Sequence, residues 1–180
     1  MPQGILILGL NGCGKTTVGR ALAKRLGFFR MDAEDYYFPV PGDYSISRTE
    51  DEVHRLMETD AEKHGDFVLS CVRCNISDTL LEHIQLAVVL RAAPEVRAER
   101  IRQREIDRFG ARVLPGGDMY EAQQAFHAFA ARRTEEMVDR SLDRLACPMI
   151  EINAALPAEM IVGQICRQLQ EQGDVSREIS

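Results

Sequence analysis

A glycine-rich segment near the start of the chain has the residue types and spacing of a phosphate-binding loop. Residues 9–16, GLNGCGKT, fit the pattern G-x-x-x-x-G-K-[ST], and they lie between an apolar stretch and a helical pattern. Glycine lets the backbone approach a ligand closely, so that successive N–H groups form a nest for an anion. The residues that we expect to bind phosphate are Gly9, Asn11, Gly12, Cys13, Gly14, Lys15, Thr16 and Thr17.

Two side chains of this loop predict which anion it binds. Lys15 can place its positive charge against the β- and γ-phosphates of a nucleotide. The hydroxyl group of Thr16 can bind Mg²⁺, which prefers oxygen ligands. The sequence therefore predicts ATP and Mg²⁺ at this loop, with Lys15 in a catalytic role.

Acidic residues follow the second apolar stretch of the chain, at Asp32, Glu34 and Asp35. A carboxylate in this place can bind the metal, or it can orient a hydroxyl group and accept its proton. The plainer alternative is a cap for a turn or a helix. We expect Asp32 to be catalytic and to bind the metal, and all three residues to bind the molecule that accepts the phosphate.

Arginine supplies most of the positive charge, since only three of the 22 basic residues are lysines. Its planar guanidinium group can bind a phosphate or a carboxylate through two parallel hydrogen bonds. Arg48 lies near the start of an expected helix, and Arg73 follows the third apolar stretch. Both are candidates to hold an anionic acceptor, although each could instead form a surface ion pair.

A second group of arginines falls on one stripe of an expected helix, at Arg97, Arg100, Arg104 and Arg108. This stripe leads into a segment rich in glycine and proline. We expect Arg104 to bind the nucleotide, and Arg108 and Arg112 to stabilise the phosphate during its transfer. Arg133 interrupts the apolar stripe of a later helix, so its charge needs a partner. That partner is either the nucleotide phosphate or a buried carboxylate.

The pattern of the whole chain predicts the elements that position these residues. Apolar runs alternate with helical patterns, as they do in a parallel sheet that is covered on both faces. The expected strands are residues 4–9, 28–31, 67–71, 86–90 and 149–152. The expected helices are residues 15–26, one from Ser47 with a capping box over 47–50, residues 94–108, residues 119–145, and one after Pro157. Ligands should bind beyond the carboxyl ends of the strands.

With these motifs the chain resembles the small P-loop kinases, the group of adenylate, shikimate and gluconate kinases. The segment 108–120, RFGARVLPGGDMY, is similar to the lid of adenylate kinases, where arginines flank a flap rich in glycine and proline. The segment 32–35 resembles the D-x-[DE] segment of shikimate kinases, and 70–73 is faintly similar to a gluconate kinase segment. The resemblance covers nearly the whole chain.

The resemblance implies a three-layer α/β P-loop fold, with a five-stranded parallel sheet in the order 2-3-1-4-5, helices on both faces and a lid. It implies a single domain over residues 1–180, with a helical acceptor-binding insert at about 36–65 and the lid at about 108–120. The loop at 153–156 would touch adenine. Ser70 stands where many P-loop proteins have a Walker B aspartate. The glycine signatures of adenylate and shikimate kinases are also absent there, which leaves the acceptor open.

The function favoured by these residues is an ATP-dependent phosphotransferase that moves the γ-phosphate of Mg-ATP to a small hydroxyl acceptor, anionic or polyhydroxyl. A nucleoside monophosphate kinase is the alternative. A nucleotide-binding switch protein with little turnover is an alternative from another class.

Composition excludes several other classes. The net charge of −6 argues against a nucleic-acid partner. No apolar run reaches the ~20 residues that span a bilayer, and no signal peptide precedes the first strand, so we expect a cytoplasmic protein. Cys71 and Cys74 form a lone pair without the further ligands of a zinc site. The four histidines show no catalytic arrangement.

Overall fold

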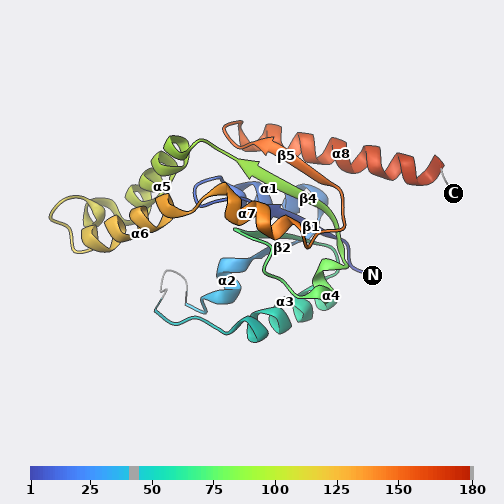
Figure 1. Cartoon of the computed structure of the whole chain (residues 1–180), viewed down its shortest axis with the longest axis horizontal. Helices are drawn as coiled ribbons and strands as arrows, with labels where there is room; N and C mark the ends of the chain where they lie inside the picture. The colour runs from blue at the N-terminus through green and yellow to red at the C-terminus, as the bar shows by residue number, and fades with distance from the viewer. Residues whose placement is uncertain (41–44, 179–180) are drawn as a thin grey trace.

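Five parallel strands form one sheet at the centre of the molecule (Figure 1). The computed structural model describes residues 1–40 and 45–178. The strands are β1 (Gly4–Leu8), β2 (Phe29–Asp32), β3 (Phe67–Cys71), β4 (Ile84–Arg91) and β5 (Met149–Asn153). Their order across the sheet is β2-β3-β1-β4-β5, and every neighbouring pair is parallel. The expected order 2-3-1-4-5 is confirmed.

Helices surround this sheet. They are α1 (Lys15–Leu26), α2 (Ala33–Tyr37), α3 (Glu50–His64), α4 (Asp78–Leu81), α5 (Pro94–Phe109), α6 (Tyr120–Arg132), α7 (Glu135–Leu142) and α8 (Ala158–Glu178), with a 3-10 turn η1 (Gly110–Val113). Helix α1 packs against β3 and α8, whereas α2, α3 and α4 lie together near the β2 edge of the sheet (Figure 1). None of the described helices is long and apolar enough to cross a membrane.

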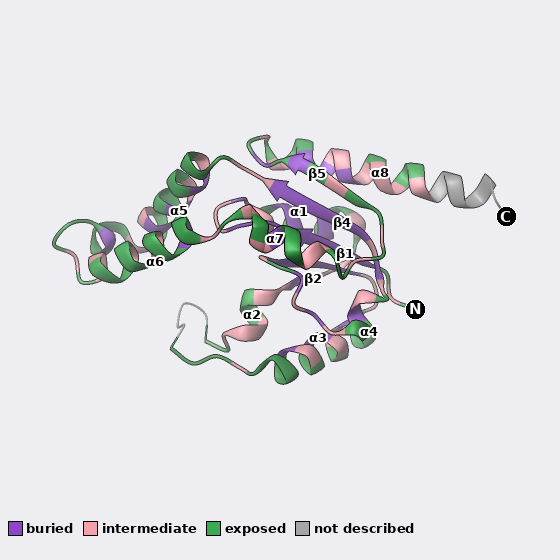
Figure 2. Cartoon of the chain, viewed as in Figure 1, coloured by how far each residue is buried: buried purple, intermediate pink, exposed green. Residues whose placement is uncertain are grey.

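The apolar sequences of the central strands explain why they lie in the middle. All five residues of β1 and all five of β3 are buried, and so are most of β4 (Figure 2). A strand that is buried on both faces has no side that faces solvent, so apolar side chains are favoured at every position. For this reason GILIL and FVLSC are continuous apolar runs. Strand β5 is exposed at alternate positions because it forms the edge of the sheet.

Two sequence-based boundaries were wrong, and each has a local cause. The helix expected from Ser47 begins at Glu50, because Thr49 caps it and exchanges hydrogen bonds with Glu52 in a complete capping box. The backbone N–H of Arg48 donates instead to the carbonyl oxygen of Tyr37, 2.9 Å away, so Arg48 precedes the helix. The expected insert at 36–65 thus contains α3, while residues 41–44 lie outside the described part of the chain.

The long helix expected over 119–145 is two helices, α6 and α7. Arg133 separates them in an extended conformation, with φ −75° and ψ 125°. The short elements α2, α4 and η1 were also missed, because segments of four or five residues show no clear helical period.

Helices α5 and α6 form an arm that projects away from the sheet, and we call residues 94–132 the helical arm (Figure 1). The two helices are joined by the buried carboxylate of Glu105, which lies 2.6 Å from Nε2 of His127. With its amide nitrogen turned toward Glu105, Gln123 donates to the same carboxylate at 2.8 Å. The segment expected as a lid, 108–120, is the tip of this arm.

The start of β1 generates a test of how tightly the sheet is packed. A Cβ atom added at Gly4 would lie 2.5 Å from the ring of Phe67 and 2.8 Å from Cδ1 of Ile84. We expect Gly4→Ala to lower stability by about 1–3 kcal/mol through overpacking, which is several degrees in melting temperature for this size of domain. Gly163 in α8 has open space around it, so Gly163→Ala should raise stability by about 0.5–1 kcal/mol. Thermal unfolding of both variants checks the pair, and equal melting temperatures would contradict it.

Candidate active site

The loop between β1 and α1 folds tightly at the carboxyl end of β1. Gly12 and Gly14 both have φ of +84°, a conformation that side chains other than glycine rarely adopt. A Cβ atom at Gly12 would lie 2.5 Å from the carbonyl oxygen of Arg97, so the loop packs directly on the first turn of α5. Gly14 is the N-cap of α1, and the positive end of that helix therefore faces the loop.

Lys15 is the first residue of α1 and is partly buried, rather than lying on an exposed loop. Its ammonium group donates to the carbonyl oxygen of Leu10 at 3.1 Å, which folds the side chain back over the loop. Burial lowers the pKa of Lys15. An anion bound in the loop would again stabilise the charged ammonium group, because its negative charge would offset the solvation that the group loses on burial.

Asp32 is the acidic residue that reaches the phosphate loop. The hydroxyl group of Thr16 donates to its carboxylate at 2.8 Å. Asp32 ends β2 and pairs in register with Ser70 of β3, which stands at the Walker B position. The Ser70 hydroxyl donates to the carbonyl oxygen of Lys15 at 3.3 Å and so supports α1 instead. A hydroxyl and a carboxylate in contact are oxygen ligands of the kind that Mg²⁺ prefers, so Thr16 and Asp32 fit the metal expected here.

The same carboxylate also holds the start of α2. Asp32 accepts from the backbone N–H of Glu34 at 3.3 Å, as an N-cap residue does. The guanidinium group of Arg30 lies 3.6 Å away. Burial raises the pKa of Asp32 despite the hydrogen bonds from Thr16 and Glu34, which lower it. The capping interpretation and the functional one are therefore compatible at this residue.

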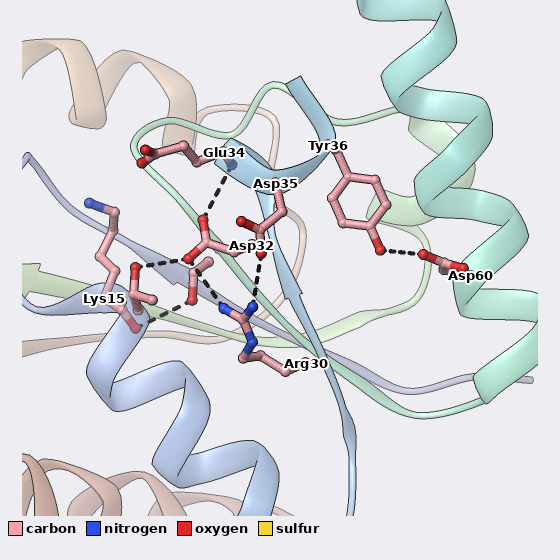
Figure 3. Close-up of polar contacts among 9 residues, drawn as sticks. Lys15, Arg30, Asp32, Glu34, Asp35, Tyr36 and Asp60 are labelled. Carbon is pink, nitrogen blue, oxygen red and sulfur yellow. Dashed lines mark hydrogen bonds and ion pairs between the residues drawn. The ribbon is translucent and has the colours of Figure 1, made fainter. Parts of the chain in front are cut away.

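The other two acidic candidates differ from each other. Asp35 accepts from Arg30 at 2.8 Å, which ties it to β2 (Figure 3). The side chain of Glu34 lies on the Lys15 side of α2 (Figure 3). Next along the helix, Tyr36 donates to Asp60 of α3 at 2.6 Å, and this bond fixes α2 against α3.

The two arginines expected to hold the acceptor have different surroundings. Arg48 donates to the carbonyl oxygen of Tyr36 at 2.7 Å, so its guanidinium group joins α2 to the start of α3. Arg73 is exposed beyond the carboxyl end of β3. Burial lowers the pKa of Arg133, and the positive charge of Arg73 lowers it further.

Arg133 lies at the phosphate loop. Its guanidinium group donates to the side-chain oxygen of Asn11 at 3.0 Å and stacks over the ring of Phe129, 4.4 Å from the centroid. Its Nε atom is buried and has no hydrogen-bond partner among the described residues. The sequence suggested two partners for this charge, the nucleotide phosphate and a buried carboxylate. Among the described residues, Arg133 contacts Asn11 and Phe129 and not a buried carboxylate.

The three arginines expected to approach the phosphate from the lid lie elsewhere on the arm. Arg104 is exposed, Arg108 stacks over Phe109 at 5.0 Å, and Arg112 pairs with Asp118 at 2.7 Å. Arg108 and Arg112 belong to the outer end of the arm, away from the phosphate loop (Figure 1). The structure therefore does not bring Arg108 and Arg112 together with Lys15 and Asp32.

Two earlier residues of the same stripe lie much closer to the loop, and sequence reasoning passed over them. Arg97 is buried rather than on a solvent-facing stripe, and its backbone packs on Gly12. Arg100 donates to the carbonyl oxygen of Ala154 at 2.7 Å, and its Nη1 atom would lie 4.0 Å from a Cβ atom at Gly14. The missing signal was the proximity of α5 to the phosphate loop. The strand order supplies this signal, because β4 lies next to β1, and α5 follows β4 as the phosphate loop follows β1.

Comparisons with known proteins bear on the family and the fold of the chain. A family model described as an AAA domain matches residues 5–110. The Bacillus subtilis (strain 168) protein YqaC, described as uncharacterized, is 32% identical over 160 residues, which cover 84% of this chain and 89% of that protein. The extent and the identity of this match make YqaC a relative of most of this chain.

Solved kinase structures share the fold. A shikimate kinase from Bacteroides thetaiotaomicron superposes with a TM-score of 0.58 and 19% identity, covering 94% of this chain and 99% of that one. A deoxyadenosine kinase from M. mycoides gives a TM-score of 0.54 and 13% identity, covering 94% and 100%. The chain therefore has the fold of the small P-loop kinases, as the resemblance implied.

Contact between Gly12 and α5 leads to a prediction about the loop. In Gly12→Ala, the new methyl group would meet the carbonyl oxygen of Arg97 in addition to straining a positive φ. We expect the loop to move and nucleotide affinity to fall at least tenfold, by calorimetric titration with Mg-ATP, while the fold persists. Gly27 also has a positive φ, +73°, but open space around it. Gly27→Ala should therefore lose about 1–2 kcal/mol of stability and no affinity. Equal nucleotide affinities in the two variants would show that the contact between Gly12 and Arg97 does not matter for binding.

Proposed function

The chain belongs to the AAA domain family of P-loop proteins, and from this premise we propose that it is a kinase that transfers the γ-phosphate of Mg-ATP to a small anionic hydroxyl compound. The observation that carries the proposal is the 2.8 Å hydrogen bond between Thr16 and Asp32. It brings a carboxylate of β2 to the phosphate loop, at the carboxyl edge of the sheet where an acceptor would enter.

The loop residues supply the nucleotide site. The glycine backbone and the start of α1 bind the phosphates, and Lys15 neutralises charge on the β- and γ-phosphate oxygens. Thr16 and Asp32 would hold Mg²⁺, which when bound screens the charge of the phosphates from the attacking oxygen. Arg100 of α5 donates to the carbonyl oxygen of Ala154, and the 153–156 loop that it holds suits the base of the nucleotide.

With the nucleotide bound, phosphoryl transfer depends on the position of the acceptor more than on covalent chemistry by the protein. The acceptor oxygen forms a bond to the γ-phosphorus as the bond from that phosphorus to the β–γ bridging oxygen breaks, and ADP leaves. The hydroxyl proton passes to the carboxylate of Asp32, which can orient the hydroxyl beforehand.

Two cations support an anionic acceptor rather than a neutral one. Arg73 is exposed at the same sheet edge, and Arg133 lies near enough for the two charges to act on each other. Arg133 is already held by Asn11 and Phe129, which suits the nucleotide phosphate. Arg73 is left to bind a carboxylate or phosphate group of the acceptor. Glu34 and Asp35 can bind hydroxyl groups of the acceptor, whereas Arg48 joins α2 to the start of α3.

The acceptor screen that tests this proposal measures ADP release from Mg-ATP with hydroxy acids, sugar acids, neutral sugars and nucleoside monophosphates. We expect hydroxyl compounds with a carboxylate or phosphate to be the substrates. Arg73→Met should raise the KM for that acceptor roughly tenfold or more and leave the KM for ATP near its wild-type value. The matched control is Arg55→Met, which removes an exposed cation of α3 that belongs to no part of the proposed site.

The same assay separates the alternatives. Turnover only with nucleoside monophosphates would favour the nucleoside monophosphate kinase, and ATP binding without turnover would favour the switch protein. Asp32→Asn should lower kcat by about 10²–10⁴-fold, as the loss of a general base does. Lys15→Met should abolish turnover with every acceptor. Full activity in either variant would refute the assigned chemistry.

The helical arm is the part of the molecule that we propose to act as the lid. In the structure, Arg112 is paired with Asp118, so the cations of the tip do not face the phosphate loop. We expect a nonhydrolysable ATP analogue to slow hydrogen exchange at 108–120 as well as at 9–17, because closure would bring the tip over the nucleotide. Protection confined to 9–17 would exclude closure of the arm, and Arg108 and Arg112 would then have no catalytic role.

A further inference from the structure

Arg91 is surrounded by carboxylates at the carboxyl end of β4. Its guanidinium group donates to Glu135 at 2.7 Å and to Glu151 at 2.8 Å, and it also binds Asp139. Glu135 and Asp139 belong to α7, whereas Glu151 belongs to β5. One cation therefore joins three elements, and only a quarter of its side chain is exposed.

These contacts fix the beginning of α7. Thr134 is the N-cap residue of this helix but makes no capping hydrogen bond with its side chain within the described chain. Glu135 and Asp139 lie one turn apart on the same face, and both are bound by Arg91. The ion pairs with Arg91 do not satisfy the backbone N–H groups of this turn as a cap would, but they hold the first turn of α7 at the ends of β4 and β5.

The residue before that start is the one that reaches the phosphate loop. Arg133 is extended, with φ −75° and ψ 125°, and it precedes Glu135 by two residues. At this distance the backbone has few free torsions between the anchored carboxylate and the guanidinium group on Asn11. Arg133 follows α6, which belongs to the helical arm, and precedes α7. The element that holds Arg133 in place is therefore α7.

We propose that Arg91 is a positioning residue that holds Arg133 against the phosphate loop by anchoring the start of α7. This inference rests on the proposed function, in which Arg133 binds nucleotide phosphate. Among the described contacts, no hydrogen bond or ion pair joins Arg91 to the phosphate loop. Its effect on the nucleotide passes through Glu135 and the two residues before it.

A double-mutant cycle tests the proposal, with Mg-ATP affinity by calorimetry as the readout, so that no acceptor is needed. Arg133→Met and Arg91→Met should each weaken binding by roughly tenfold or more. The double variant should bind no more weakly than Arg133→Met alone, because a residue that acts only through Arg133 has nothing to add once Arg133 is gone. Independent residues would instead multiply their effects.

Further variants separate positioning from general support. Glu135→Gln should reproduce the loss while Arg91 keeps its pairs with Asp139 and Glu151, so it avoids leaving a cluster of unpaired carboxylates. Glu151→Gln removes the link to β5 alone and should bind ATP as the wild type does. Arg140→Met is the matched control, since Arg140 is an exposed cation of α7 paired only with Glu136 among the described contacts.

The results that would overturn the positioning role of Arg91 differ from those that would refute the proposed kinase function. Multiplicative effects in the cycle, or an unchanged affinity in Glu135→Gln, would overturn the positioning role. An Arg133→Met variant with full ATP affinity would overturn it as well. Loss of ATP binding in Lys15→Met alongside these results would leave the proposed function standing, whereas no ATP binding by the wild type would refute the function itself.

Discussion

The hydrogen bond between Thr16 and Asp32 depends on how closely α1 approaches the sheet. Asp32 lies on β2, two strands away from β1, where the phosphate loop begins. The helix can reach across only because small residues separate it from β3. A Cβ atom at Gly19 would lie 2.4 Å from the Ser70 hydroxyl, so glycine on the helix and serine on the strand permit this contact. An aspartate at the Ser70 position would need that same space.

The placement of the acidic group has consequences for the rest of the site. Because Asp32 also caps α2, the residues that follow it turn toward the insert, where Tyr36 binds Asp60. The acidic residues therefore lie on one side of the phosphate loop, along α2. The cations Arg97, Arg100 and Arg133 approach the loop from α5 and the start of α7.

Much of this arrangement could be predicted from sequence, because it follows from local chemistry. The phosphate loop needs glycine at fixed positions, and its flanking strand and helix are strongly patterned. The position of Asp32 near the phosphate loop could be predicted because it follows a short apolar run, and parallel strands share one ligand edge. The strand order came from the resemblance, since no periodicity reveals which strands are neighbours.

The remaining features depend on contacts that span the sequence. A single helical pattern runs across 119–145, yet Arg133 leaves it to reach Asn11, more than a hundred residues earlier. Helical spacing grouped Arg97 with Arg108, but the first packs under Gly12 and the second lies on the outer part of the arm. The period of a helix gives the direction of a side chain and not its distance from the loop. The position of an arginine along the helical arm decides whether it lies near a bound phosphate, and the helix face that it shares with other arginines does not. Only a movement of the arm could bring the outer arginines closer to the phosphate loop.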